Sequence, residues 1–513
     1  MLELESHLCG RWQRGAGRGE PLVNPSTEEP LGTAASEGLD LAAALAWARD
    51  RGGPALRSLT FAERGELLRG LSRALHAHRD ELIGLAIQNG GNTRGDAKFD
   101  IDGASGTLAA YADLGASLGA ARVLADGEAL QLSRSPRLAG RHLLTPRRGV
   151  AVHVNAFNFP AWGLAEKAAV ALLAGVPVLS KPATSTALVA WRIARIFADE
   201  KLLPEGALSF LAGGPAGLLD ALGPQDALAF TGGSATAAKI RAHPAFVERG
   251  ARLNVEADSL NVAILGPDVE EGSEVLDLFL ADVARDVTQK AGQKCTAIRR
   301  AYVPAGKVEV VVERLRERLQ AVRVGDPADE STGMGPLATA RQAGDVREGL
   351  AALAQAAKLV TGGGRREGKG YFVAPTLLVS ERPAPGDAVH TREVFGPAAT
   401  VVPYDGTAAQ AAERAAWGGG GLVGSVYSDD RAFLAEAVLE LAPHHGRLTL
   451  GSAKVAAQAL PPGMVLPLLV HGGPGRAGGG EELGGLRGLA FYQQRTALQG
   501  DRALLDAIVG KAR

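Results

Sequence analysis

The chain has little cysteine and no concentration of charge of one sign. Only two of its 513 residues are cysteine, and the CxxC and HExxH patterns are absent. A disulfide framework and a structural zinc site are therefore not expected, and no metal is predicted. With 55 basic and 56 acidic residues the net charge is -1, and no block of five lysines or arginines occurs. These features argue against a partner that is a nucleic acid.

Long apolar runs are also missing. The longest, residues 168–179, spans 12 positions and is interrupted by Gly175 and Pro177, whereas a bilayer-spanning helix needs roughly 20 apolar residues. The N-terminus is acidic and lacks the apolar centre of a signal peptide. The sequence therefore predicts a cytoplasmic protein with no membrane partner. Its length predicts two or three domains, because single cores rarely grow beyond about 250–300 residues.

Two stretches of the chain alternate short β-rich runs with helical segments. The first begins at Gly149 and continues to Ala242, and the second begins at Leu260 and continues to Leu450. This alternation predicts an α/β fold with doubly wound parallel sheets. Residues 121–148 alternate leucine and arginine and are expected to form a hairpin. Residues 472–485 contain eight glycines, a composition typical of a linker, yet they include Glu482.

Cys295 lies in the run Gly292-Gln293-Lys294-Cys295-Thr296, which is polar and contains glycine. Buried structural cysteines usually have apolar neighbours, whereas a reactive thiolate needs an accessible, electropositive setting. Lys294, next to the cysteine, fits such a setting. Considered alone, Cys295 is equally well interpreted as a small core residue or as a nucleophile.

Four further segments hold groups that a thiol-based oxidation uses. The amide of Asn158 could polarise an oxyanion, and Lys181 ends a strand at the edge where doubly wound sheets bind ligands. Residues 230–234 open a helix where a pyrophosphate could lie. Glu256 is a lone carboxylate at a strand end, where partial burial would raise its pKa and make it a base. Each segment has an equally good structural explanation when it is considered alone. Asn158 could cap a helix and Lys181 could be a surface lysine. Residues 230–234 could be a simple turn, and Glu256 could be a solvated carboxylate.

In their order along the chain, these motifs resemble the aldehyde dehydrogenase superfamily over essentially the whole length. The Gly-Gln-x-Cys and Glu-x-Phe-Gly-Pro motifs are specific, and so many ordered matches by chance are very improbable. The resemblance implies two doubly wound α/β domains plus a small β oligomerisation flap. Besides the Glu256 strand, the matches are Asn24-Pro25-Ser26-Thr27, Asn158-Phe159-Pro160, Lys181-Pro182, Phe230-Thr231-Gly232, Gly292-Gln293-Lys294-Cys295, Glu393-Val394-Phe395-Gly396-Pro397, Glu482-Leu483-Gly484 and Gly488-Leu489-Ala490-Phe491-Tyr492.

The resemblance also assigns residue ranges to these parts. Residues 1–120 and 149–258 would form the dinucleotide-binding domain, and residues 259–478 the catalytic domain. Residues 121–148 and 487–513 would form the oligomerisation element. A homodimer is expected from this element, with a tetramer as the alternative.

By similarity, Cys295 is the nucleophile that attacks the carbonyl of a small-molecule aldehyde. The Asn158 amide and the Cys295 backbone N–H would form the oxyanion hole. Glu256 would activate the water that hydrolyses the resulting thioester, and could also deprotonate the thiol. Lys167 and Glu482 match family residues of a proton relay connected to that base.

The resemblance further implies a nicotinamide cofactor. NAD-preferring members often carry a glutamate two residues after the Lys-Pro pair, and Thr184 occupies that position here. Without this carboxylate a 2′-phosphate meets less repulsion and Lys181 is a ready cation, so NADP is favoured and NAD remains possible. The residues expected at the cofactor are Ala156, Phe157, Lys181, Ala183, Thr184, Gly214, Gly232, Gly233, Ser234, Glu393 and Phe395.

Several runs depart from the common family pattern without removing a reacting group. Ala257-Asp258-Ser259 follows Glu256 where Leu-Gly-Gly is usual, and Ala156-Phe157 replaces Pro-Trp. The run Phe-Thr-Gly-Gly-Ser would supply the phosphate-binding hydroxyl from Ser234. Residues 255–261 and 471–476 are similar to a branch of the superfamily that degrades aromatic rings. The expected substrate is therefore a semialdehyde, either free or carried as a CoA thioester.

Three other functions remain as alternatives. A CoA-acylating dehydrogenase would use the same cysteine but typically lacks the base, so Glu256 argues against it. A cysteine hydrolase normally needs a histidine, and none lies within about forty residues of Cys295, although separation along the chain does not exclude proximity in space. A catalytically silent protein is disfavoured because Cys295, Glu256 and Asn158 are all present.

Overall fold

The computed structural model describes residues 2–215, 217–364 and 368–511. The predicted oligomerisation range 487–513 ends in two residues, 512 and 513, that lie outside the described part, as do residues 1, 216 and 365–367 of the two predicted domains. None of the helices within the described ranges combines the length and the apolar character that crossing a bilayer requires.

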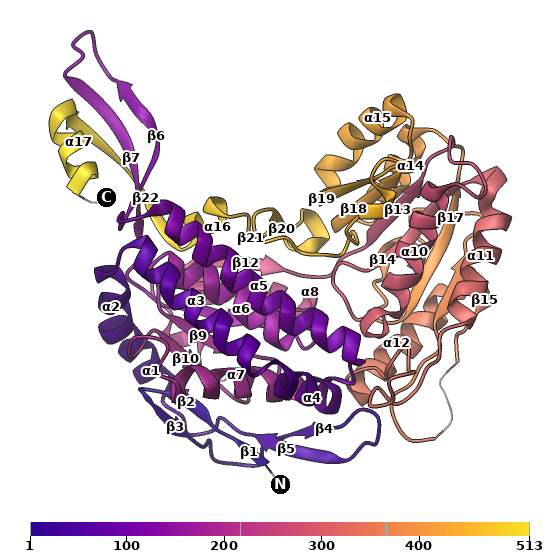
Figure 1. Cartoon of the computed structure of the whole chain (residues 1–513), viewed down its shortest axis with the longest axis horizontal. Coiled ribbons are helices and arrows are strands. Elements are labelled where there is room, and N and C mark those ends of the chain that lie inside the picture. The colour runs from indigo at the N-terminus through magenta and orange to yellow at the C-terminus, as the bar shows by residue number, and fades with distance from the viewer. Residues whose placement is uncertain (1, 216, 365–367, 512–513) are drawn as a thin grey trace.

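A seven-stranded sheet forms the centre of the N-terminal half (Figure 1). Five of its strands run parallel, and two short strands from the N-terminus extend one edge in antiparallel pairing. In spatial order the strands are β12 (Arg252–Glu256), β11 (Ala227–Thr231), β8 (Ala151–Val154), β9 (Val178–Lys181), β10 (Leu208–Phe210), β2 (Ser6–Leu8) and β3 (Arg11–Gln13).

Helix α6 (Pro160–Leu173) is buried along nearly all its length because α5 (Arg94–Leu118) and α3 (Phe61–Ala77) pack against it. Proline at its first position suits a helix start, where the missing N–H costs nothing. The carboxylate of Asp100 accepts the backbone N–H of Trp162 at 2.8 Å and so caps the same end. These restraints fix the turn between β8 and α6.

A second seven-stranded sheet forms the C-terminal half. All of its strands are parallel except β15, which pairs antiparallel with β16 at one edge. The central strands are buried on both faces, as parallel strands covered by helices are. In spatial order they are β15 (Lys358–Thr361), β16 (Thr376–Val379), β17 (Ala398–Tyr404), β14 (Ile298–Pro304), β13 (Asn261–Leu265), β18 (Gly421–Tyr427) and β19 (His445–Gly451).

The remaining helices follow or precede these strands along the chain (Figure 1). They are α1 (Leu41–Trp47), α2 (Gly53–Ser58), α4 (Arg79–Gly90), α7 (Ala187–Asp199), α8 (Ser234–Arg241), α9 (Pro244–Val247), α10 (Glu274–Thr288), α11 (Val308–Gln320), α12 (Ala340–Leu353), α13 (Ala388–Thr391), α14 (Ala408–Ala416), α15 (Arg431–Leu441), α16 (Leu486–Phe491) and α17 (Arg502–Lys511).

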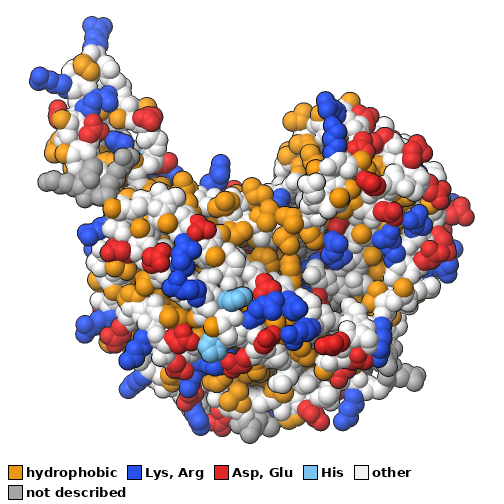
Figure 2. All heavy atoms as spheres, in the orientation of Figure 1, with side chains coloured by type: hydrophobic (Ala, Val, Ile, Leu, Met, Phe, Trp, Pro, Cys, Tyr) orange, Lys and Arg blue, Asp and Glu red, His pale blue; other side chains and the backbone are white. Residues whose placement is uncertain are grey.

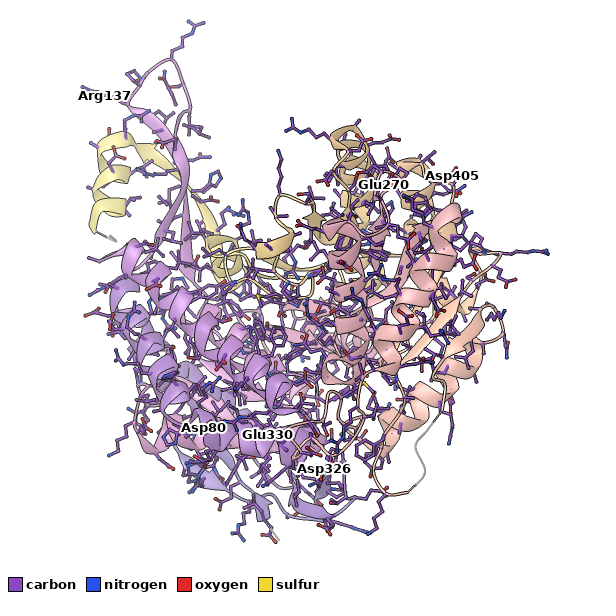
Figure 3. The ribbon with its side chains drawn as sticks, turned by 45° about the vertical axis from the view of Figure 1, so that its right-hand side comes forward. Asp80, Arg137, Glu270, Asp326, Glu330 and Asp405 are labelled. Carbon is purple, nitrogen blue, oxygen red and sulfur yellow. The ribbon has the colours of Figure 1, made fainter. Side chains whose placement is uncertain are left out.

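A three-stranded antiparallel sheet projects from the body of the molecule (Figure 1). β6 (Leu124–Gln131) and β7 (Leu138–Pro146) form the predicted hairpin, and the C-terminal β22 (Gln493–Asp501) pairs with β7. Figure 2 shows hydrophobic side chains gathered in the hollow between this sheet and the second large sheet. In Figure 3, Arg137 lies near the tip of the hairpin.

Two small sheets complete the fold. β1 (Leu2–Leu4), β5 (Pro30–Ala34) and β4 (Glu20–Val23) form one near the N-terminus. The glycine-rich residues 472–485 are not a plain linker, because β20 (Val470–Gly472) pairs antiparallel with β21 (Glu481–Leu483). The predicted α/β class with doubly wound parallel sheets is confirmed.

Candidate active site

One pocket collects residues that are far apart in the sequence. Four of the five predicted catalytic residues line it, namely Asn158, Lys167, Glu256 and Cys295. The fifth, Glu482, lies behind the pocket wall and contacts Lys167. The apolar part of the lining is supplied by Phe99, Phe159, Trp162 and Val465.

The loop that carries Cys295 is held by main-chain contacts. Gly292 has a positive φ of 68°, and a Cβ there would meet the Gly396 carbonyl oxygen at 2.1 Å, so only glycine fits. The Arg299 guanidinium donates to the carbonyls of Gly292 and Gly396, each at 2.9 Å. Asn261 donates to the Cys295 carbonyl at 2.8 Å. The sulfur position is thus fixed by its backbone, while the residue itself is half-buried.

Asn158 lies in the turn between β8 and α6, directly before the capped helix end. Its side chain is buried, and Nδ2 donates to the Gln293 carbonyl at 3.0 Å. This hydrogen bond ties the amide to the loop that carries Cys295. Asn158 is not a helix cap, because the N-cap position belongs to Phe159.

Glu256 is the last residue of β12, and its carboxylate faces His471, which the sequence had not predicted as a site residue. His471 Nε2 lies 3.1 Å from Glu256 Oε2, and the two side chains are 4% and 3% exposed. Cys295 Sγ, a carboxylate oxygen of Glu256 and a ring nitrogen of His471 all lie within 4.8 Å of one another.

The charge state of Glu256 differs from the one expected. Burial raises the pKa of Glu256, but the charge and hydrogen bond of His471, with the charge of Lys167, outweigh it. The pKa is therefore held below its usual range, and the predicted rise is wrong. Burial and the charge of Glu256 raise the pKa of the Cys295 thiol well above its ordinary value. The free site thus holds a neutral thiol beside an ionised carboxylate.

Lys294 does not supply the electropositive setting suggested by its place beside Cys295. Its side chain is 1% exposed, and Nζ lies 2.6 Å from Asp286 Oδ1 and 2.8 Å from Gln289 Oε1. The ammonium group is therefore committed to a buried pair on α10. That interpretation of Lys294 is wrong because its ammonium group is bound by Asp286 of α10 and by Gln289.

Lys167 and Glu482 form a buried charged group behind Glu256. Lys167 Nζ lies 3.0 Å from Glu482 Oε2 and 3.1 Å from Glu166 Oε1. Burial lowers the pKa of Lys167, but the charges of Glu482, Glu166 and Glu256 outweigh it, so the ammonium stays charged. Burial raises the pKa of Glu482 to about 7 despite the charge of Lys167. Glu482 is therefore able to exchange a proton near neutral pH.

Several predicted cofactor residues meet at the carboxyl ends of the strands. The rings of Phe157 and Phe395 are in edge contact, with centroids 5.7 Å apart. Glu393 Oε2 accepts the Ser259 N–H at 3.1 Å, while Oε1 is 3.8 Å from Arg299 Nε, beyond hydrogen-bond length. That oxygen fits an acceptor for a ribose hydroxyl. Burial raises the pKa of Glu393 to about 7.

The other end of the predicted cofactor site carries a buried cation and a helix start. Lys181 ends β9 with 8% exposure, and burial lowers its pKa. Thr184 begins a short 3-10 turn after Ala183 and is 6% exposed. Gly232 and Gly233 lead into α8, whose Ser234 hydroxyl and N–H both contact Asp258. Ala156 lines the pocket, and Gly214 lies in the loop after β10.

A cation, a helix N-terminus and a carboxylate acceptor are the groups that a nicotinamide dinucleotide requires, so these residues fit it. Sequence reasoning missed three members of the site. His471 had been noted only within a branch motif, and Asp258 only as a departure from the family pattern. Arg299 lies on β14, and the only feature of the sequence that could have indicated its role is a charged residue within an apolar strand.

A model of the aldehyde dehydrogenase family matches residues 12–496. The chain belongs to this family and is an aldehyde dehydrogenase, an oxidoreductase. It is 44% identical over 480 residues to the 3,4-dehydroadipyl-CoA semialdehyde dehydrogenase of Aromatoleum evansii. The aligned region covers 92% of this chain and 93% of that protein. It is 28% identical to the NADP(+) succinate-semialdehyde dehydrogenase of Escherichia coli (strain K12), over 78% of this chain and 80% of that one. The crystal structure of lactaldehyde dehydrogenase from Escherichia coli has a TM-score of 0.84 at 26% identity, covering 97% and 99% of the two chains.

Proposed function

We propose that this enzyme oxidises 3,4-dehydroadipyl-CoA semialdehyde to the carboxylic acid, in CoA-dependent benzoate degradation, with NADP as cofactor. The observation that carries the chemistry is the 4.8 Å grouping of Cys295 Sγ with the Glu256 carboxylate in a pocket that Asn158 also lines. The similarity to the Aromatoleum evansii protein supports the substrate.

In the first step the Cys295 sulfur attacks the aldehyde carbonyl and its proton passes to Glu256. The oxygen of the new thiohemiacetal gains negative charge as the carbonyl bond opens. Asn158 Nδ2 and the Cys295 backbone N–H would donate to that oxygen. The hydrogen bond from Asn158 Nδ2 to the neighbouring Gln293 carbonyl restrains the amide, and Nδ2 has a second hydrogen for this role. Donors fixed before the reaction stabilise the charge without reorganisation.

When bound, the nicotinamide cofactor would supply the hydride acceptor, so that oxidation of the thiohemiacetal carbon would leave a thioester on Cys295. Glu393 and Phe395 would hold the ribose and ring end, and Ser234 the pyrophosphate. We propose that the first large sheet, within residues 1–120 and 149–258, binds the dinucleotide, and that residues 259–478 carry the nucleophile.

Glu256 then takes a proton from the water that attacks the thioester. The acid leaves and the Cys295 thiol is restored. Glu482 and Lys167 lie behind Glu256 and can carry the proton away, because Glu482 has a pKa of about 7. The presence of a carboxylate base beside the sulfur favours hydrolysis over transfer of the acyl group to CoA.

NADP is favoured over NAD by the absence of a carboxylate at Thr184. A 2′-phosphate brought to the end of β9 would meet the Lys181 ammonium and no opposing charge at position 184. NAD remains the alternative cofactor, and a ring-cleavage semialdehyde of phenylacetate catabolism or a broader range of aldehydes is the alternative substrate.

The function is tested by offering the enzyme a panel of semialdehydes, free and as CoA thioesters, with NADP and with NAD. We expect reduced cofactor, detected by absorbance, to form with the highest kcat/KM for the CoA-linked semialdehyde and NADP. C295A should abolish this signal, whereas C9A is the matched control, because Cys9 lies on the turn between β2 and β3, outside the pocket. Full activity of C295A would disprove the mechanism.

We also propose a cytoplasmic homodimer built through the projecting sheet, with residues 121–148 and 487–513 as the oligomerisation element. Exposed leucines lie at and near the start of α16, which leads into β22, and a monomer would leave them in water: Leu468 is 62%, Leu469 50% and Leu486 49% exposed. Two unpaired cysteines suit a reducing compartment. Light scattering during size-exclusion chromatography distinguishes a dimer from a monomer or tetramer.

A further inference from the structure

His471 reaches the active site from the C-terminal part of the chain through two short glycine-rich strands. β20 and β21 pair antiparallel, with His471 opposite Glu482. The segment between them lies against β12: the Gly480 N–H donates to the Val255 carbonyl at 3.1 Å. A Cβ at Gly480 would meet that carbonyl oxygen at 2.5 Å. The absence of a side chain at Gly480 lets this segment approach the strand end that carries Glu256.

We infer that His471 is a positioning residue for Glu256, holding one carboxylate oxygen so that the other serves the thiol and the attacking water. The inference rests on the proposed role of Glu256 as the base. The supporting geometry is the 3.1 Å contact from His471 Nε2 to Glu256 Oε2, between side chains that are almost fully buried.

The other charged groups around Glu256 do not replace this contact. Lys167 and Glu166 face it from α6, Glu482 from β21, Cys295 from its loop and Arg447 from β19. Lys167 is already paired with Glu166 and Glu482. Among the described residues, His471 is thus the one cation within ion-pair distance of Glu256.

The reaction explains why such a partner is needed. Glu256 gains the thiol proton in the first step and must lose it before it can take a proton from water. A buried carboxylate without a cation favours the neutral acid and would retain that proton. Burial lowers the pKa of His471, yet the charge of Glu256 raises it above its ordinary value, so the two groups stabilise each other as an ion pair.

The test compares H471Q with the unmodified enzyme. Glutamine keeps an N–H donor but carries no charge. We expect a first-turnover burst of reduced cofactor of unchanged amplitude, followed by a steady-state rate at neutral pH that is about tenfold to a hundredfold lower. The acid limb of the kcat–pH profile should move to higher pH, so that activity recovers in alkaline buffer. H445Q is the matched control, because His445 is also buried but bonds the Leu441 carbonyl outside the pocket.

A double-mutant cycle separates positioning from a general structural role. A residue that acts only through Glu256 has no effect on the rate when Glu256 is already replaced. The double variant H471Q/E256Q should therefore have the same steady-state rate as E256Q alone. Additive losses in the double variant, or an unshifted acid limb in H471Q, would overturn the inference. Full activity of E256Q alone would instead refute the proposed function.

The unmodified enzyme provides a measurement that does not depend on the variant folding. If His471 lowers the proton affinity of Glu256, the acid limb of kcat lies below the usual glutamate range rather than above it. An acid limb near neutral pH, in the absence of any substitution, would also overturn the inference.

Discussion

The Asp258 carboxylate accepts the backbone N–H of Ser234 at 3.1 Å and also its hydroxyl, at the N-terminus of α8. A carboxylate thus occupies the helix end that is proposed to receive the cofactor pyrophosphate. Helix N-termini attract anions of either kind, so the two compete for the same donors.

The first prediction is that D258N binds NADP more tightly than the unmodified enzyme. Removing the charge removes both the competitor and its repulsion of the phosphates, and we expect Kd to fall by about threefold to tenfold. Quenching of protein fluorescence measures binding without turnover. D268N is the control, because Asp268 makes a similar contact with Ser428, away from the site. An unchanged or weaker affinity in D258N would show that Asp258 does not compete.

E256Q is predicted to separate acylation from hydrolysis. The amide has a similar size but cannot take a proton from water, so kcat should fall by about 10²–10⁴-fold. The burst of reduced cofactor should keep its amplitude, although it forms more slowly without an acceptor for the thiol proton. The steady-state rate should fall further, because hydrolysis also needs the water-activating base. Rapid-mixing absorbance resolves the two phases, and equal loss of both would contradict the assigned role.

T184E is predicted to shift cofactor preference from NADP toward NAD. A carboxylate at this position repels the 2′-phosphate and can accept the ribose hydroxyls of NAD. The ratio of kcat/KM values should change by about tenfold, equivalent to about 1.4 kcal/mol. T184Q is the matched variant of similar size without charge and should leave the ratio close to that of the unmodified enzyme. If both variants behave alike, size rather than charge sets the preference.

Glu393 is predicted to make the cofactor-free enzyme less stable as pH rises. Burial raises its pKa from 4.5 to about 7, so the folded state binds the proton more tightly than the unfolded chain. The resulting stabilisation is complete below the unfolded value and is lost as pH rises through about 7, amounting to roughly 3 kcal/mol or less. Melting temperatures of E393Q and the unmodified enzyme should diverge across this range, with E393Q the more stable at pH 8. Parallel curves would mean that Glu393 does not titrate there.

The sequence predicted the α/β class and named five catalytic candidates, four of which line one pocket in the structure. Asn158, Glu256 and Cys295 were identifiable because each follows a strand or a constrained loop whose neighbours form a recognisable run. His471 could not be found this way, because it reaches Glu256 only through the pairing of two short strands in a glycine-rich segment. The pKa of Glu256 was mispredicted for the same reason, and Lys294 because adjacency in sequence does not set side-chain direction.

The guanidinium of Arg299 donates hydrogen bonds to the Gly292 carbonyl of the nucleophile loop and to the Gly396 carbonyl within the Glu393 motif. One side chain therefore joins the segment that carries the sulfur to the segment proposed to hold the cofactor ribose. These hydrogen bonds therefore set the distance between the sulfur and the nicotinamide site, across which hydride must travel, before substrate or cofactor binds. A substitution of Arg299 should therefore lower the acylation rate and the cofactor affinity together. A change confined to Cys295 or to Glu393 would not lower both in this correlated way.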